Sequence, residues 1–199
     1  YFKMDVKLDK WHKCHIDKEI LKELSKKSDL KGFQHVSVFF GLLIITGTLA
    51  FITWGTWWSV FWFLVYGNIY SFSNPLWHET GHKTAFKSKY LNEIFYYISS
   101  FMSNFEPIRW RYTHFVHHGN TYSTDNPFDH EIEYDNDLKE TPKRLLINII
   151  PFLGLFFLKK HITFEIIQHG LGIKTKVMQD SIPESVQSKA IFNSRVYCF

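Results

Sequence analysis

The feature that most restricts the fold is a long uncharged interval. Between Gly32 and His78 the chain contains no Asp, Glu, Lys or Arg, and the interval is rich in Phe, Trp, Leu, Ile and Val. A membrane-spanning helix needs about 20 mainly apolar residues, so the interval is long enough for two spans. We expect these spans near Phe33–Thr53 and Trp57–Leu76, joined by a tight turn at Trp54–Thr56.

The distribution of charge gives this hairpin an orientation. Residues 1–31 contain nine lysines, and the turn contains no charged residue. Basic residues return after the second span, at Lys83, Lys87, Lys89, Arg109 and Arg111. An excess of Lys and Arg marks the cytoplasmic side. The chain is therefore predicted to be integral to an inner or plasma membrane, with its N-terminus and the region after the second span in the cytoplasm.

Five of the eleven histidines form two clusters just after the uncharged interval. His78 and His82 are four residues apart, and His114 is followed by His117 and His118. On a helix, each cluster would lie on one face. Neutral imidazole is the commonest metal ligand and suits iron, zinc, copper or nickel. Five imidazoles exceed what one structural zinc uses, so we predict a metal centre built from these five histidines.

Together these features predict an all-α protein, with an integral membrane helical bundle and a cytoplasmic helical cap that carries the histidines. We divide the chain into a basic cytoplasmic segment, residues 1–31, and a partial domain over residues 32–199, with the hairpin at about 33–76. Two apolar runs, Ile94–Phe105 and Leu145–Leu158, are too short to span a bilayer. We expect both to lie on the cytoplasmic membrane surface.

The remaining composition argues against several kinds of function. The formal net charge is +4, the lysines are interspersed with acidic residues, and no recognition motif occurs, so no nucleic-acid partner is expected. Cys14 and Cys198 lie at opposite ends of the chain, so neither a disulfide nor a thiol site is expected. Because the chain starts without methionine and stops in mid-pattern at Phe199, we expect it to be a fragment.

The first cluster also fits a different enzyme class. His78-Glu79-x-x-His82 is the motif of zinc metalloproteases, in which two histidines bind zinc and the glutamate acts as general base. A single-zinc protease gives no reason for the second cluster, His114-x-x-His117-His118. A non-catalytic membrane protein that binds or carries a metal is the other alternative.

The two clusters and their surroundings resemble the membrane fatty-acid desaturase and hydroxylase superfamily. Three strings carry the resemblance: WHETGHKTAF (Trp77–Phe86), LNEIFYYISSFM (Leu91–Met102) and RWRYTHFVHHGNT (Arg109–Thr121). They are most similar to the branch of hydrocarbon and rhizopine oxygenases. The resemblance covers most of the chain, from the membrane hairpin to the C-terminus.

The resemblance implies a non-haem di-iron centre that uses O2 and two electrons to attack an unactivated C–H bond of a lipid or hydrocarbon chain. It implies His78, His82, His114, His117 and His118 as iron ligands. It also implies an electron donor such as a ferredoxin or a cytochrome-type protein. The superfamily has a third histidine box, and the later histidines, at 130, 161 and 169, lack its spacing. We expect that box beyond the end of this chain, and the fragment alone to be inactive.

Other side chains are candidates for smaller roles. Glu79 is expected to orient a ligand histidine, and His130 is a weak candidate for an extra ligand. His35 is expected at the membrane interface. Arg109 and Arg111 are expected to anchor the helix of the second cluster to the membrane surface, or to help dock an acidic electron donor.

Overall fold

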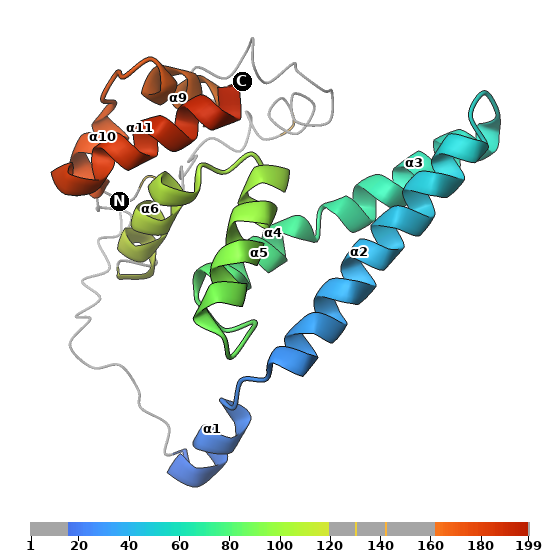
Figure 1. Cartoon of the computed structure of the whole chain (residues 1–199), viewed down its shortest axis with the longest axis horizontal. Coiled ribbons are helices and arrows are strands. Elements are labelled where there is room, and N and C mark those ends of the chain that lie inside the picture. The colour runs from blue at the N-terminus through green and yellow to red at the C-terminus, as the bar shows by residue number, and fades with distance from the viewer. Residues whose placement is uncertain (1–15, 120–129, 131–141, 143–161, 199) are drawn as a thin grey trace.

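A computed structural model of the chain describes residues 16–119, 130, 142 and 162–198. This part of the chain is helical and contains no strand, which confirms the predicted all-α class (Figure 1). The helices are α1 (Lys18–Leu24), α2 (Asp29–Ile52), α3 (Trp57–Tyr70), α4 (Ser73–Gly81), α5 (Lys89–Met102), α6 (Pro107–Gly119), α9 (Ile162–Gly170), α10 (Lys176–Ser181) and α11 (Glu184–Cys198).

Helix α2 contains nearly all of the first predicted span. Ser28 caps its N-terminus by accepting a hydrogen bond from the backbone N–H of Lys31 at 3.4 Å. The helix has 24 residues, which at 1.5 Å per residue is about 36 Å and exceeds the hydrocarbon core of a bilayer, about 30 Å. Among the described residues, α2 is the one helix long and apolar enough to cross a membrane by length and composition.

The second predicted span, Trp57–Leu76, is not one continuous helix. Helix α3 ends at Tyr70, and α4 begins at Ser73 after a two-residue turn. Pro75 explains the interruption, because it has no N–H to donate to the carbonyl of Ser71 four residues earlier. That carbonyl instead accepts from the N–H of Asn74 at 3.2 Å. With 14 residues, α3 rises only about 21 Å.

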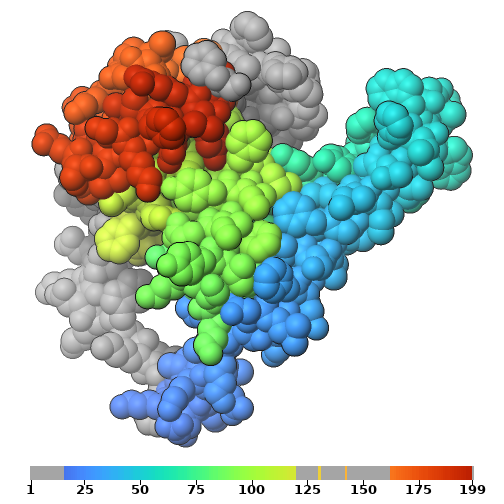
Figure 2. Space-filling view, viewed as in Figure 1, coloured from blue at the N-terminus to red at the C-terminus, as the bar shows by residue number. Residues whose placement is uncertain are grey.

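Helices α2 and α3 form the predicted hairpin, and it projects from the rest of the molecule (Figures 1 and 2). The turn includes Gly55 in the left-handed region, at φ 84°, as its position between the helices requires. Outward-facing side chains of the hairpin are large and apolar, with Ile44 69 %, Trp57 87 % and Leu64 71 % exposed. An apolar surface of this kind suits contact with lipid or another protein better than contact with water.

Helices α4, α5, α6, α9, α10 and α11 form the body that carries the histidines (Figure 1). Helix α5 packs on α4, and α6 packs on α5, α10 and α11. An apolar core between α6, α10 and α11 consists of Ile108, Met178, Ile182 and Ala190. The predicted surface run Ile94–Phe105 lies mostly in α5, which buries Tyr96 against its neighbours and exposes Ile94 and Phe101. The run Leu145–Leu158 lies outside the described residues.

At Gly32, near the start of α2, the backbone of this helix lies very close to the body. A Cβ atom at Gly32 would lie 2.4 Å from a ring carbon of Phe86 and 2.7 Å from the carbonyl oxygen of Ala85. Phe86 is fully buried, so neither neighbour can yield easily. We expect Gly32→Ala to lower the free energy of unfolding by about 1–3 kcal/mol through overpacking, measured by thermal unfolding in detergent.

Gly41 provides the matched control in the same helix. A Cβ atom there would meet nothing within 4 Å among the described residues. Gly41→Ala is therefore expected to be neutral, or to stabilise by up to about 1 kcal/mol through its higher helix propensity. Equal effects of the two substitutions would contradict the proposed close approach.

Candidate metal centre

Two helices bring four of the predicted histidines together. His78 lies on α4 and His82 forms its C-cap, while His114 and His118 are one turn apart on α6. One ring nitrogen from each lies within 4.8 Å of those of the other three. His114 is shared by two contacts: its Nε2 lies 3.0 Å from Nε2 of His82 and 3.0 Å from Nε2 of His118. Both helices therefore supply part of one site.

The donor set fits a transition-metal ion. Metal–imidazole bonds of about 2.0–2.1 Å, at angles of about 90–109°, place ligand nitrogens roughly 2.9–3.4 Å apart, and the two contacts of His114 lie in this range. A neutral ring nitrogen carries either one proton or one lone pair, so Nε2 of His114 cannot hydrogen-bond to both neighbours at once. A cation bound by all three nitrogens would fit the arrangement.

The protonation state of the site favours metal binding. Partial burial lowers the pKa of His82, and the neighbouring imidazoles of His78, His114 and His118 lower it further. The neutral form, which has the lone pair that a metal needs, is thereby favoured at neutral pH. The four histidines line a cavity of ≈ 400 Å³ together with Trp77, Gly81, Tyr96, Trp110, Arg111 and Phe115.

His117 is not in the group of four. Its ring centroid lies 6.1 Å from that of His114 and 5.9 Å from that of His118. On a helix, residues four apart point in nearly the same direction, whereas His117 is rotated by about 100° from its neighbour His118. The predicted role of His117 as a ligand therefore stays a prediction.

Trp77 packs between the two histidine-bearing helices. It is 5 % exposed, and its ring lies 5.4 Å from that of His114 and 5.7 Å from that of Trp110, in both cases edge to face. It also stacks on Tyr96, with the two ring centroids 6.3 Å apart. Aromatic pairs of this geometry add about 0.5–1.5 kcal/mol each beyond burial. This packing fixes the distance between α4 and α6.

Tyr96 connects α5 to the start of α6. Its hydroxyl donates a 2.7 Å hydrogen bond to the carbonyl of Pro107. Burial raises the pKa of Tyr96, so the hydroxyl remains a donor at any physiological pH. The guanidinium of Arg111 lies 4.5 Å from the ring centroid of Tyr96 and also pairs with Glu93 at 2.9 Å. A Cβ atom at Gly81 would lie 3.0 Å from the ring of Tyr96, so α4 also packs closely against this ring.

Glu106 caps the N-terminus of α6 from a fully buried position. Its carboxylate accepts hydrogen bonds from the backbone N–H groups of Ile108 at 3.0 Å and Arg109 at 2.6 Å. Burial raises the pKa of Glu106, and these two backbone hydrogen bonds oppose that rise. We did not predict this role, although an acidic residue directly before Pro107 is a signal of a helix start.

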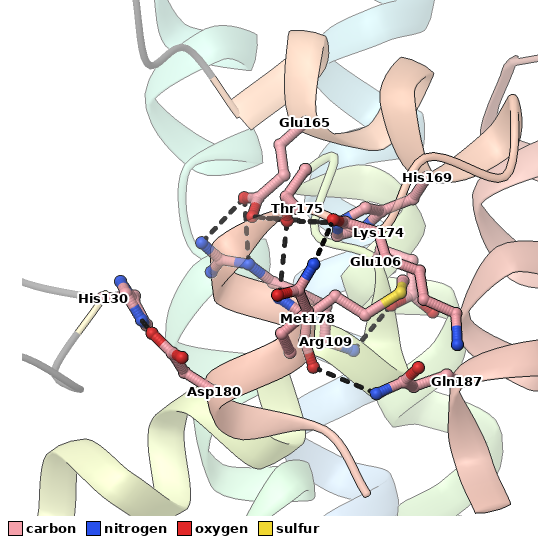
Figure 3. A network of polar contacts seen from close by, with 11 residues as sticks. Glu106, Arg109, His130, Glu165, His169, Lys174, Thr175, Met178, Asp180 and Gln187 are labelled. Atoms are coloured by element: carbon pink, nitrogen blue, oxygen red, sulfur yellow. Dashed lines mark hydrogen bonds and ion pairs between the residues drawn. The ribbon is translucent and has the colours of Figure 1, made fainter. Parts of the chain in front are cut away.

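Arg109 holds α6 to α9 through a buried ion pair (Figure 3). Its guanidinium contacts Oε2 of Glu165 at 2.9 and 3.2 Å. Thr175 donates to the other oxygen of Glu165 at 3.4 Å and lies 2.8 Å from Nε2 of the buried His169. Burial lowers the pKa of His169. The expectation that Arg109 anchors its helix to the membrane surface is wrong, because its partner is an internal carboxylate; Arg111 likewise pairs within the protein.

Glu79 lies away from the histidine cavity. Its Oε2 accepts a 2.6 Å hydrogen bond from the hydroxyl of Thr84, and its Oε1 lies 3.9 Å from Nδ1 of His78. The latter distance is too long for a hydrogen bond, so the predicted orienting contact is not formed. The general base of a zinc protease must reach a metal-bound water, and Glu79 lines a different cavity.

The other histidine candidates also lie elsewhere. His130 pairs with Asp180 at 3.2 Å, outside the group of four (Figure 3). His35 is exposed on α2 and lines the same cavity as Glu79. The contact of His130 with Asp180 therefore does not support the prediction that His130 is an extra metal ligand.

The family of the chain follows from its match to a known protein family. Residues 52–191 match the family described as fatty acid desaturase. No curated protein and no solved structure matches the chain. The matched range is well over half of the chain and contains α4 and α6 with their histidines. The predicted superfamily is thus confirmed: the chain belongs to the fatty acid desaturase family.

Proposed function

We propose that the protein is an O2-dependent di-iron oxidoreductase that introduces a double bond or a hydroxyl group into a fatty-acyl or hydrocarbon-like chain. Desaturase-type oxidation of a lipid is what the family implies. The observation that carries the proposal is the group of four histidines whose ligand nitrogens lie within 4.8 Å of one another. Imidazole-rich sites with open positions suit redox-active iron.

The proposed roles of the chain's own residues follow from this arrangement. His78, His82, His114 and His118 would hold one iron, and His117 would contribute to a second with ligands outside the described residues. Bound iron would supply the oxidising power for an unactivated C–H bond, which no side chain has. Trp77 and Tyr96 would line the site with apolar surface and keep water away from it.

The proposed setting is a membrane. Desaturases are generally membrane-bound, and α2 is long and apolar enough to span one. We propose a basic N-terminal segment, residues 1–31, and a desaturase-like domain over 32–199, with the histidines on the cytoplasmic side. The excess of lysine before α2 supports this orientation. A ferredoxin or cytochrome-type protein would deliver the electrons.

Metal content tests the proposal directly. The protein would be expressed from the complete reading frame that contains residues 1–199 and purified from membranes in detergent, and iron and zinc would be counted per chain by mass spectrometry. We expect about two irons per chain and little zinc. About one zinc per chain, unaffected by loss of His117 and His118, would favour the protease alternative. Absence of any bound metal would contradict both readings.

A single substitution of Glu79 distinguishes the proposed oxidoreductase from the protease alternative. Because its carboxylate is bonded to Thr84 and lies outside the histidine cavity, we expect Glu79→Gln to change acyl-chain oxidation by less than about tenfold, which is below the roughly 10- to 100-fold effect of losing a residue that supports a metal ligand. Thr84→Val, which removes the same contact from the other side, should behave alike. Complete loss of activity in Glu79→Gln alone would point to a general base.

A further inference from the structure

A second cavity lies beside α4 and shares no lining residue with the histidine cavity. Its volume is ≈ 660 Å³, within the size range of ligand sites. Helix α2 forms one wall, and α3, α4 and residues 84–85 form the other. The break between α3 and α4 occurs at this cavity, since Ile69 before it and Phe72 within it both line the wall.

The α2 wall changes from charged to apolar along its length. Lys31, His35, Val38, Phe39 and Leu42 line it, at spacings of three and four residues that place them on one helical face. The eleven steps along the helix from Lys31 to Leu42 rise about 16 Å, which is close to the depth of one leaflet's hydrocarbon, about 15 Å. The cavity therefore has the polarity profile of a lipid, with a charged end and an apolar length.

The charged end is positive. Lys26, Lys27 and Lys31 line it against one acidic residue, Glu79, whose carboxylate is already bonded to Thr84. The ammonium group of Lys27 is held by a 2.7 Å hydrogen bond to the carbonyl of Lys83. This contact fixes one lysine at the mouth of the cavity without neutralising its charge. The mouth is thus complementary to an anionic group.

We propose that this cavity binds one anionic glycerophospholipid, with its phosphate at Lys26 and Lys31 and an acyl chain along Val38 and Leu42. The lipid is distinct from the substrate, because α4 separates this cavity from the histidines. Anionic lipids are enriched in the cytoplasmic leaflet, the side on which the basic end of α2 is proposed to lie. The bound lipid would fill the space between α2 and α4 and support the helix that carries His78 and His82.

Native mass spectrometry of the detergent-purified protein, incubated with phosphatidylglycerol or with phosphatidylcholine, tests the proposal. We expect about one retained phosphatidylglycerol per chain and at least tenfold weaker retention of phosphatidylcholine. The double variant Lys26→Gln, Lys31→Gln should lose the preference. Lys18→Gln, Lys22→Gln is the matched control, because it removes the same charge from exposed positions on α1 that do not line the cavity.

A second pair of variants tests the apolar length of the cavity. Leu42→Trp would fill it and is expected to expel the lipid, whereas Ile44→Trp places the same bulk on an exposed face of α2 that does not line it. Equal retention of the two lipids, retention in Leu42→Trp, or a free fatty acid as the bound species would overturn the proposal. Iron content, measured on the same samples, distinguishes failure at this cavity from failure of the metal centre.

Discussion

Replacing His114 with alanine is expected to remove the iron held by the group of four histidines and to abolish the oxidation of acyl chains. Its Nε2 lies 3.0 Å from the ring nitrogens of both His82 and His118, so its loss opens the middle of the ligand set. Loss of residues that merely support a ligand weakens metal affinity about 10- to 100-fold, and loss of the ligand itself should exceed that. Iron per chain, measured after dialysis, gives the result.

Two further histidine variants make this result specific. His35→Ala removes an imidazole outside the group of four and is expected to keep the metal content of the unmodified protein. His117→Ala should lose about one of two irons if His117 serves a second iron as proposed. Retention of all metal in His114→Ala would contradict the candidate site, whereas retention in His117→Ala would remove only that residue from the ligand set.

The parts of the fold that follow local rules were predicted from the sequence. The uncharged interval predicted α2, and the turn beside Gly55 lies where the glycine suggested. The spacing of four residues placed His78 with His82, and His114 with His118, on common helical faces. The break at Ser71 and Phe72 was missed because no charged residue marks it, although Pro75 carried the signal.

The contacts that set the site's geometry are not local, and so the sequence did not reveal them. Arg109 and Glu165 are 56 residues apart, and no periodicity relates them. In the sequence, Trp77 is one of many aromatic residues in an apolar interval. In the fold, it packs against the rings of both His78 and His114. Which faces of α4 and α6 meet is decided by such pairs, whose partners depend on the tertiary fold.

The buried ion pair makes the second large prediction, which concerns stability. Arg109 and Glu165 have 6 % and 14 % of their side-chain surface exposed. Removing one member of a buried pair leaves an uncompensated charge, at a cost of about 3–5 kcal/mol. Arg109→Met is therefore expected to lower the melting temperature by roughly 6–20 °C for a chain of this size, measured in detergent. The double variant Arg109→Met, Glu165→Leu should recover much of this loss.

An exposed pair in the same protein provides the control for that prediction. Lys83 and Glu93 are 3.7 Å apart with 50 % and 36 % of their side chains exposed, and such pairs contribute about 0–1 kcal/mol. Lys83→Met should therefore shift the melting temperature far less than Arg109→Met. If both variants lower the melting temperature equally, the Arg109–Glu165 pair does not hold α6. If Arg109→Met alone unfolds early and also loses iron in the folded state, α6 depends on α9 to present His114 and His118 to the metal.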